Sequence, residues 1–264
     1  MIDTPFESLR HLVVVPVLLN GIERRFVLDS GIGLTLVREG LDGCRPAGTT
    51  FTGKRMSGQE VSVPLAAVGR VSFAGVNRTD EEVGVLDMGG FPQALDDIDG
   101  FLSLAFFRQQ PFSIDYELGT IRDGTGASGT RIPMRLEVDG PSVTAFMSLS
   151  IPGRVTADVE VDMGSDALIL DERLAGPTGA RLDAADARRE EGVDELGNRY
   201  IRTFSRLEGS IHPAGAPDLV QHDPDVMFQR IIYDGLLGHA FLSRFSVTWD
   251  IPNSQISLDP RSLR

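Results

Sequence analysis

Cysteine and positive charge are scarce in this chain, and each shortage excludes something. Cys44 is the single cysteine among 264 residues, so no disulfide can form within one chain. No histidine lies beside it in the sequence, and we expect a packed or surface thiol rather than a nucleophile. The 25 Lys and Arg residues are outnumbered by 38 Asp and Glu, which gives a formal net charge of −13. Nucleic acids and anionic membranes bind basic faces, so the charge argues against both as partners.

Long apolar runs are also missing. The run Leu12–Leu19 is well short of the roughly 20 apolar residues that a membrane-spanning helix needs. Asp3 and Glu7 precede it in place of a basic leader, and no small-residue cleavage site follows it. We therefore expect a cytoplasmic protein that does not associate with membranes.

The composition that is present is typical of a globular protein with many turns. Hydrophobic residues make up 41% of the chain and charged residues 24%, which is enough to bury a core. The chain is long enough for one large domain or two of ordinary size. With 29 glycines, 15 prolines and only 7% aromatic residues, the sequence indicates short strands separated by frequent turns.

One acidic motif occurs twice. Phe26–Gly31 has the sequence FVLDSG, in which three apolar residues of a buried strand lead directly into Asp29. Val159–Ser165, with the sequence VEVDMGS, has the same form around Asp162. A carboxylate at the end of a buried strand is costly unless it is hydrogen-bonded or functional. The two acids are 133 residues apart (162 − 29), about half of the chain.

The segments around the two acids repeat in the same order. In the first half, Asn20-Gly21 between apolar runs predicts a hairpin that leads to Asp29. A second hairpin over Phe51–Pro64 has its tip at Met56–Gln59, and the apolar segment Asp99–Phe107 follows. The second half repeats a strand, a turn and a strand before its acid. These matches predict a duplicated β unit.

The later parts of the second half repeat the first half as well, with two exceptions. Tyr200–Phe204 matches the return strand of the hairpin, and Asp234–Phe241 matches the apolar segment. Ala180–Glu191 is interpreted as a charge-rich surface helix, and Ile211–Asp225 as an inserted loop without a counterpart. Leu196–Arg199 is expected to form the tip of the second hairpin.

A small, polar segment divides the chain. Residues 124–130 read GTGASGT, a composition typical of a linker. We therefore predict an N-terminal lobe over residues 1–123, with Asp29 and the hairpin tip, and a C-terminal lobe over residues 131–264, with Asp162. Residues 1–10 can either mask a cleft or add a strand between the lobes.

These motifs resemble the pepsin and retropepsin family of aspartic proteases. The family pattern is two apolar residues, Asp, Thr or Ser, and Gly in each lobe, then a hairpin flap, then two apolar residues and Gly. Phe101–Ser103 and Leu236–Gly238 match the last of these elements. The resemblance covers roughly Leu12–Leu258. It implies an all-β fold of two β-barrel lobes related by a pseudo-twofold axis, with a few short helices.

The resemblance also implies a reaction and its residues. Asp29 and Asp162 would share one proton and activate a water that attacks a peptide bond. Active-site loop support would come from four residues: Ser30, Gly31, Gly164 and Ser165. The flap that binds substrate would be Met56, Ser57, Gly58 and Gln59. The implied partner is a peptide or protein substrate cut by a monomer, with no cofactor and no metal.

Three positions differ from the family pattern. Met163 replaces a Thr or Ser that normally joins the two Asp loops, Ile32 replaces a small or hydroxyl residue, and Ser103 replaces a glycine. Ser165 could donate a hydrogen bond to the outer oxygen of Asp162, whereas Ile32 cannot do this for Asp29. Losing these hydroxyls predicts a pair of acids that gives up its first proton at higher pH than in a pepsin.

Plainer interpretations of the same residues stay open. Asp29 and Asp162 can be turn carboxylates at the ends of strands, and Met56–Gln59 can be an ordinary exposed hairpin. His212, His222, Asp223 and Asp225 could suggest a metal site, but their irregular segment favours a polar surface loop. The main functional alternative to an endopeptidase is a catalytically weak or inactive peptide-binding protein with the same fold.

Overall fold

The protein is built mostly of β-strands with a few short helices, which confirms the all-β prediction at that level. The computed structural model describes residues 3–126, 128–183, 187–193 and 199–260. No helix within these residues is long and apolar enough to cross a membrane.

The strands of the N-terminal half are β1 (Thr4–Pro5), β2 (Glu7–Leu9), β3 (Leu12–Leu19), β4 (Ile22–Leu28), β5 (Leu36–Arg38), β6 (Cys44–Lys54), β7 (Glu60–Phe73), β8 (Val76–Leu86), β9 (Gly100–Leu102), β10 (Phe112–Asp115) and β11 (Thr120–Asp123). Those of the C-terminal half are β12 (Thr130–Pro133), β13 (Arg135–Asp139), β14 (Ser142–Ile151), β15 (Val155–Val161), β16 (Leu168–Asp171), β17 (Arg188–Val193), β18 (Arg199–Arg206), β19 (Ser210–Pro213), β20 (Gln221–His222), β21 (Asp225–Gln229), β22 (Gly235–Leu237), β23 (Phe245–Asp250) and β24 (Gln255–Pro260).

The helices are short. The α-helices in the described residues are α1 (Ala175–Thr178) and α2 (His239–Leu242), and the 3₁₀-helices are η1 (Gln93–Leu95), η2 (Leu104–Phe107), η3 (Pro152–Arg154), η4 (Glu172–Leu174) and η5 (Ile251–Asn253). Both η2 and α2 begin immediately after the short central strands β9 and β22.

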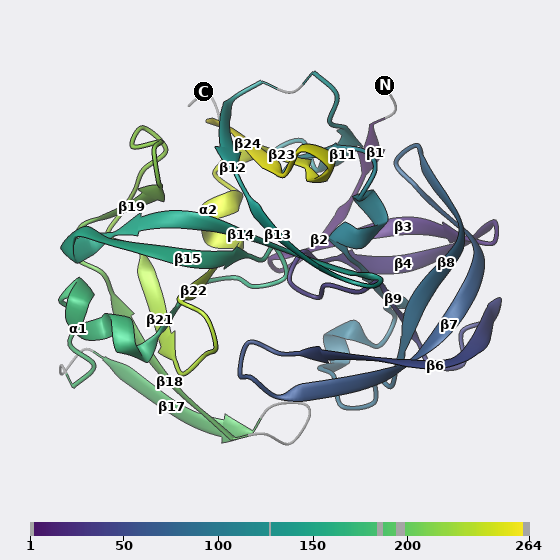
Figure 1. Ribbon diagram of the computed structural model, residues 1–264, viewed down its shortest axis with the longest axis horizontal. Coiled ribbons are helices and arrows are strands. Elements are labelled where there is room, and N and C mark those ends of the chain that lie inside the picture. The colour runs from purple at the N-terminus through teal and green to yellow at the C-terminus, as the bar shows by residue number, and fades with distance from the viewer. Residues whose placement is uncertain (1–2, 127, 184–186, 194–198, 261–264) are drawn as a thin grey trace.

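The described strands form three sheets (Figure 1). An eight-stranded sheet of order β2-β3-β4-β9-β5-β8-β7-β6 uses the N-terminal half and lies on the right of Figure 1. A ten-stranded sheet uses the C-terminal half, in the order β17-β18-β21-β16-β22-β15-β14-β19-β20 with β13 on β14, and lies on the left. The third sheet, of order β1-β11-β10-β23-β24-β12, takes strands from both halves.

The two large sheets repeat one pairing scheme. Each half has a hairpin, β3–β4 or β14–β15, whose second strand pairs in parallel with a short buried strand, β9 or β22. The same short strand then pairs antiparallel with β5 or β16, the strand that follows the acidic motif. Strands surrounded in this way are buried on both faces, which explains the apolar run Phe26–Leu28 before Asp29 and the burial of Val159 and Val161 before Asp162. The two halves therefore share one scheme of strand pairing.

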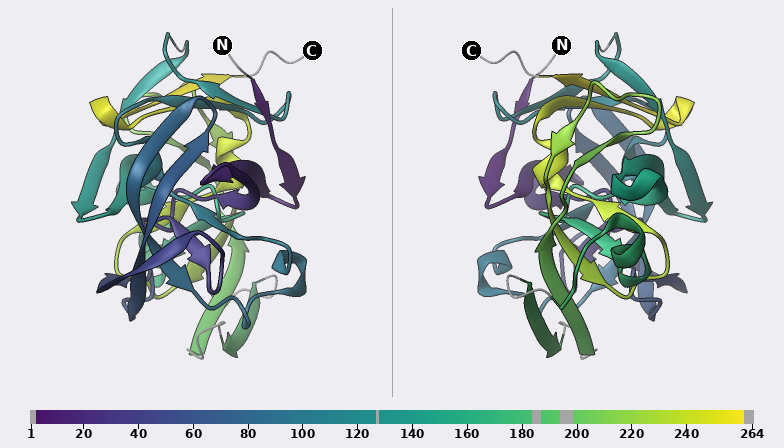
Figure 2. Two further views of the ribbon diagram at one scale, coloured as in Figure 1. Left: turned by 90° about the vertical axis from the view of Figure 1, so that its right-hand side faces the viewer. Right: turned by 90° about the vertical axis from the view of Figure 1, so that its left-hand side faces the viewer.

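The six-stranded sheet joins the two halves at one end of the molecule. Ser113 of β10 pairs with Thr248 of β23, and their hydroxyls hydrogen-bond at 2.6 Å. The first described strand, β1, pairs with β11 at one edge, and β12 pairs with β24 at the other (Figure 2). Residues Thr4–Pro5 thus add a strand at the edge of this shared sheet, beside β11, rather than between the two halves. The predicted linker 124–130 begins after the end of β11, and its last residue, Thr130, begins β12, whereas the domain boundary itself stays a prediction.

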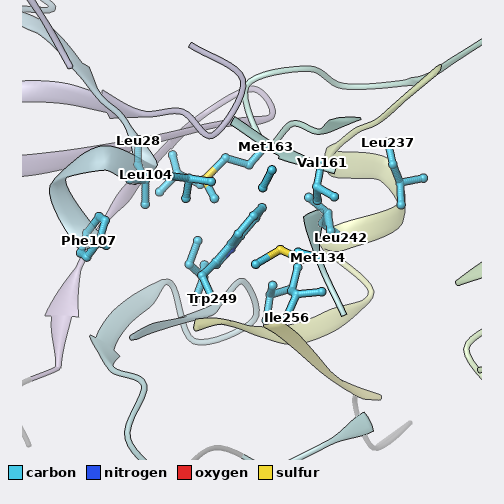
Figure 3. Close-up of a cluster of buried hydrophobic side chains, with 14 of the residues drawn as sticks. Leu28, Leu104, Phe107, Met134, Val161, Met163, Leu237, Leu242, Trp249 and Ile256 are labelled. Atoms are coloured by element: carbon cyan, nitrogen blue, oxygen red, sulfur yellow. The ribbon is translucent and has the colours of Figure 1, made fainter. Parts of the chain in front are cut away.

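The main hydrophobic core spans both halves. Trp249 is fully buried at its centre, and Figure 3 shows it between side chains from the two acidic motifs and from the six-stranded sheet. The labelled members of this cluster are Leu28, Leu104, Phe107, Met134, Val161, Met163, Leu237, Leu242, Trp249 and Ile256. The loops that carry Asp29 and Asp162 therefore start from a single packed core.

Two sequence interpretations are wrong. The predicted helix over Ala180–Glu191 is contradicted because Arg188–Val193 is strand β17, paired with β18; residues 184–186 lie outside the described part. Four charged residues follow one another along this exposed edge strand, and that composition alone resembles a polar helix. The expected hairpin tip over Leu196–Arg199 falls mostly on residues 194–198, which are not described.

The other error concerns Ile211–Asp225, which is not an insertion without a counterpart. Strand β19 pairs with β14 and β20, just as β7 pairs with β3 and β8 in the first half. The long β7–β8 hairpin is thus matched by β18–β19 and β20–β21, where the strands are interrupted. Prolines at 213, 217 and 224 remove the ladder donors that a continuous strand needs, which hides the strands in the sequence.

Candidate active site

The structure brings Asp29 and Asp162 together on loops of matching geometry. The backbone N–H of Asp29 donates to the Leu102 carbonyl at 3.0 Å, and that of Asp162 donates to the Leu237 carbonyl at 3.0 Å. These two bonds continue the parallel pairings β4–β9 and β15–β22 by one residue. Each acid is therefore held at the end of a rigid, buried strand pair.

The glycine two residues after each acid fixes its carboxylate. The N–H of Gly31 donates to Asp29 Oδ1 at 2.9 Å, and that of Gly164 donates to Asp162 Oδ1 at 2.8 Å. A Cβ atom on Gly31 would lie 2.3 Å from Cγ of Asp162, and one on Gly164 would lie 2.5 Å from Cγ of Asp29. Each glycine thus covers the acid of the opposite loop, and any side chain would separate the two.

The two carboxylates are close enough to hydrogen-bond to each other. Both side chains are partly accessible to solvent but are otherwise enclosed by protein. Burial raises the pKa of Asp29, and hydrogen bonds from Gly31, Asp162 and the Ile32 backbone oppose that rise. Burial, together with the charges of Asp29 and Glu160, raises the pKa of Asp162 well above its ordinary value. The pair therefore keeps a proton to higher pH than an isolated carboxyl would, and Asp162 holds it more tightly.

Ser30 ties the two loops together from beneath. Its hydroxyl donates to the Val161 carbonyl at 2.7 Å and accepts from the Met163 N–H at 2.8 Å, and the side chain is fully buried. The position equivalent to Ser30 in the second loop is Met163, which has no hydroxyl to return the bonds. Its side chain lies instead in the hydrophobic core (Figure 3). The link between the loops is therefore one-sided.

Glu160 is a third buried carboxyl beside the pair. It lies two residues before Asp162 on β15 and is only 5% exposed. The hydroxyl of Tyr233 donates to its Oε2. Burial raises the pKa of Glu160 to about 7, an effect that Tyr233 opposes and the charges of Asp29 and Glu137 reinforce. Sequence reasoning passed over Glu160, although a glutamate within an apolar strand was a usable signal.

A basic cavity lies behind the second loop. It measures about 460 Å³ and is lined by Arg10, His11, Asp166 and His239. His11 Nε2 lies 3.1 Å from the carbonyl oxygen of Gly164, the residue that covers Asp29. The histidine therefore supports the loop from outside, a contribution that no sequence motif indicated.

The tip of the β6–β7 hairpin reaches the other half of the molecule. Met56 packs against a cluster that contains Ile231 and Leu236, and its carbonyl accepts from the Ile232 N–H at 2.9 Å. Gly58 has a φ of +85°, and a Cβ there would lie 2.8 Å from Cγ2 of Ile232. The four tip residues Met56–Gln59 are thus at a hairpin turn, as expected, and the turn contacts the segment before β22.

Two further residues, Ser165 and Ser103, do not hold the acids with their side chains. Among the hydrogen bonds of the described residues, none joins the Ser165 hydroxyl to Asp162; the Ser165 carbonyl instead accepts from the His239 N–H at 2.7 Å. Ser103 caps η2 and bonds to Thr35 at 3.1 Å, so its hydroxyl is fully used within the first half. Both changes leave the acids to be held by backbone groups.

The histidines that suggested a metal are bonded elsewhere. His222 Nδ1 lies 2.8 Å from the Ser210 hydroxyl, and His212 Nδ1 lies 2.9 Å from the carbonyl of Pro213. In the described residues, no group of three or more His, Cys, Asp or Glu side chains is arranged to hold a metal ion.

The bonds of Ser30 generate a stability prediction. We expect Ser30→Ala to lower the free energy of unfolding by about 1–3 kcal/mol, because the Met163 N–H and the Val161 carbonyl would be buried without a partner. Urea unfolding measures this change. Ser62→Ala is the matched control, since that hydroxyl bonds to Thr52 on an exposed hairpin and should cost less than about 0.5 kcal/mol. Equal losses in the two variants would contradict the assigned role of Ser30.

The pKa of Glu160 generates a second prediction. Unfolded Glu has an ordinary pKa of 4.5 and folded Glu160 about 7, so the folded state holds the proton longer and loses stability as pH rises between these values. We expect Glu160 to account for about 3 kcal/mol of this loss, so that the native protein loses about that much more stability than Glu160→Gln, in which the Asp29–Asp162 pair still titrates. Urea unfolding at pH 5 and pH 8 tests it, with the exposed Glu137→Gln as control. Parallel changes in the native protein and Glu160→Gln would refute the buried, protonated state.

The comparisons with family models and with curated proteins identify no relative of this chain. No protein-family model matches the chain, and a search of curated proteins finds no match.

Proposed function

We propose that the protein is an aspartic endopeptidase whose two β-barrel lobes, residues 1–123 and 131–264, are related by a pseudo-twofold axis. The repeated pairing scheme of the two large sheets supports the two lobes. The single observation that carries the function is the contact between Asp29 and Asp162. Two carboxylates that served only to form turns would repel one another. They would not be held in contact by Gly31 and Gly164, each of which covers the acid of the opposite loop.

The unequal surroundings of the two acids assign their parts in the reaction. Asp162, with its more strongly raised pKa, holds the shared proton and donates a hydrogen bond to the carbonyl oxygen of the scissile peptide bond. Asp29 is ionised and takes a proton from a water molecule, which attacks the carbonyl carbon. Breakdown of the tetrahedral intermediate requires a proton on the leaving amine, and the Asp29 carboxyl now carries one. The cycle needs no covalent intermediate.

The hairpin tip has the position of a flap in this mechanism. Its contact with Ile232 joins the hairpin to the other half and would be broken when a peptide enters. Exposed backbone on an extended hairpin can bind the substrate as an added strand, and closure afterwards excludes bulk water from the acids.

A second function, peptide binding without cleavage, has one observation in its favour. Met163 removes the hydroxyl that would return the bonds of Ser30, so one of the two loops lacks side-chain support. The hydrogen bonds from Gly31 and Gly164 still orient both carboxylates, which favours catalysis. The two functions differ in a single measurement, which is whether bound peptides are cut.

We expect Asp29→Asn and Asp162→Asn each to lower kcat for peptide cleavage by at least roughly 10²–10⁴-fold, because an amide cannot share or transfer the proton. Mass spectrometry of a digested peptide library measures this, with the exposed Asp42→Asn as control.

Native activity should peak at mildly acidic to neutral pH, yield to pepstatin-like inhibitors and resist chelators. If only Asp29 is essential, a dimer that pairs two copies of Asp29 replaces this model.

The hairpin contact gives a prediction about motion. We expect the amides of Ser57 and Gly58 to exchange hydrogen more slowly when a statine-type peptide binds, because the ligand would hold the tip in place. Hydrogen–deuterium exchange with mass spectrometry at saturating ligand measures the change. The exposed turn at Gly75 is the internal control and should be unaffected. Unchanged exchange at the tip would remove the flap from the mechanism.

A further inference from the structure

Glu160 occupies a position that distinguishes the two halves. Asp162 directly follows β15, and Glu160 lies two residues before it, a spacing that places side chains of an extended chain on the same face. The equivalent residue of the first half, 133 positions earlier, is Val27, which is fully buried in an apolar cluster. The residues at the equivalent positions beside the two acids therefore differ in chemistry, apolar in one half and acidic in the other.

Apolar side chains surround the Glu160 carboxyl. Its cross-strand neighbours are Phe146 on β14 and Leu236 on β22. The ring of Tyr233 packs edge-on against Phe146, with ring centroids 5.6 Å apart. Leu236 also belongs to a small cluster that the hairpin tip covers through Met56, with the further members Ile169, Met227, Ile231, Phe204 and Tyr233.

Among the residues that the structure describes, no cation is assigned to Glu160. Asp29, Asp162 and Glu137 are carboxylates, and each disfavours a second negative charge. Arg135 lies over the Phe146 ring and is already paired with Glu137 and Asp158, both at 2.5 Å. Tyr233 bonds to Oε2 alone. A buried carboxyl without a cation is costly to a protein, and a ligand that supplies the cation recovers that cost.

We propose that Glu160 is a specificity-determining residue that receives a lysine or arginine side chain of the bound peptide beside Asp162. The proposal rests on the proposed function, since it names the substrate class of the same site. The aliphatic stem of the basic residue packs against the cluster under Met56, and its charged end bonds to Glu160. The net charge of −13 attracts basic peptides to the site.

The test measures binding rather than cleavage. Asp29→Asn protein is titrated with pairs of peptides that differ only by lysine or leucine at one position, scanned along the peptide. We expect one position where lysine binds at least about tenfold more tightly at pH 8, because hydrogen bonds to charged groups are the strong ones. The preference should shrink at pH 5.5, where Glu160 is protonated.

Two variants decide the role of Glu160. Glu160→Gln keeps an acceptor for Tyr233 without the charge, and Glu160→Val introduces the residue found at the equivalent position 27. Both should abolish the lysine preference, whereas the exposed Glu137→Gln should keep it. A preference that survives both changes, or no preference at any position, overturns the proposal. If the native protein cuts nothing but the preference depends on Glu160, the endopeptidase is wrong and the basic subsite stands.

Discussion

The close contact of two carboxylates is the constraint on which the rest of this structure depends. Two like charges repel strongly where water is partly excluded, so the pair is stable only if it shares a proton. Reciprocal coverage by Gly31 and Gly164 enforces the contact, and the hydrogen bonds of Ser30 hold the loops in register. Both strands that lead into the loops are anchored in one core around Trp249, which resists their separation.

The two halves share a scheme of pairing but not a chemistry. In the second half, apolar Met163 replaces the loop-joining hydroxyl, and acidic Glu160 replaces an apolar residue. Met163 stabilises its loop by packing in place of hydrogen bonds, and Glu160 places a third carboxyl beside the pair. Together with burial, that carboxyl raises the pKa of Asp162 and makes the two acids unequal. These differences between the halves thus distinguish Asp162, which holds the shared proton more tightly, from Asp29, to which it would otherwise be equivalent.

Local patterns in the sequence were sufficient to predict much of the fold. The Asn20-Gly21 turn, the hairpin tip at Met56–Gln59 and the apolar run before Asp29 each depend on neighbouring residues, and the structure confirms them. Arg188–Val193 was misjudged because an exposed edge strand and a polar helix share a charge-rich composition. The prolines around β19–β21 hid strands whose partners are distant in the chain.

The sequence alone determined which residues carry acids at strand ends, because apolar runs, turn glycines and their 133-residue spacing are local and countable. Only the tertiary structure decided what those acids face. The contact of Asp29 with Asp162, the burial of Glu160 under Tyr233 and the contact of the hairpin with Ile232 join residues distant in sequence. Desolvation and charge coupling depend on such through-space distances, so the pKa values of the acids follow from the packed fold.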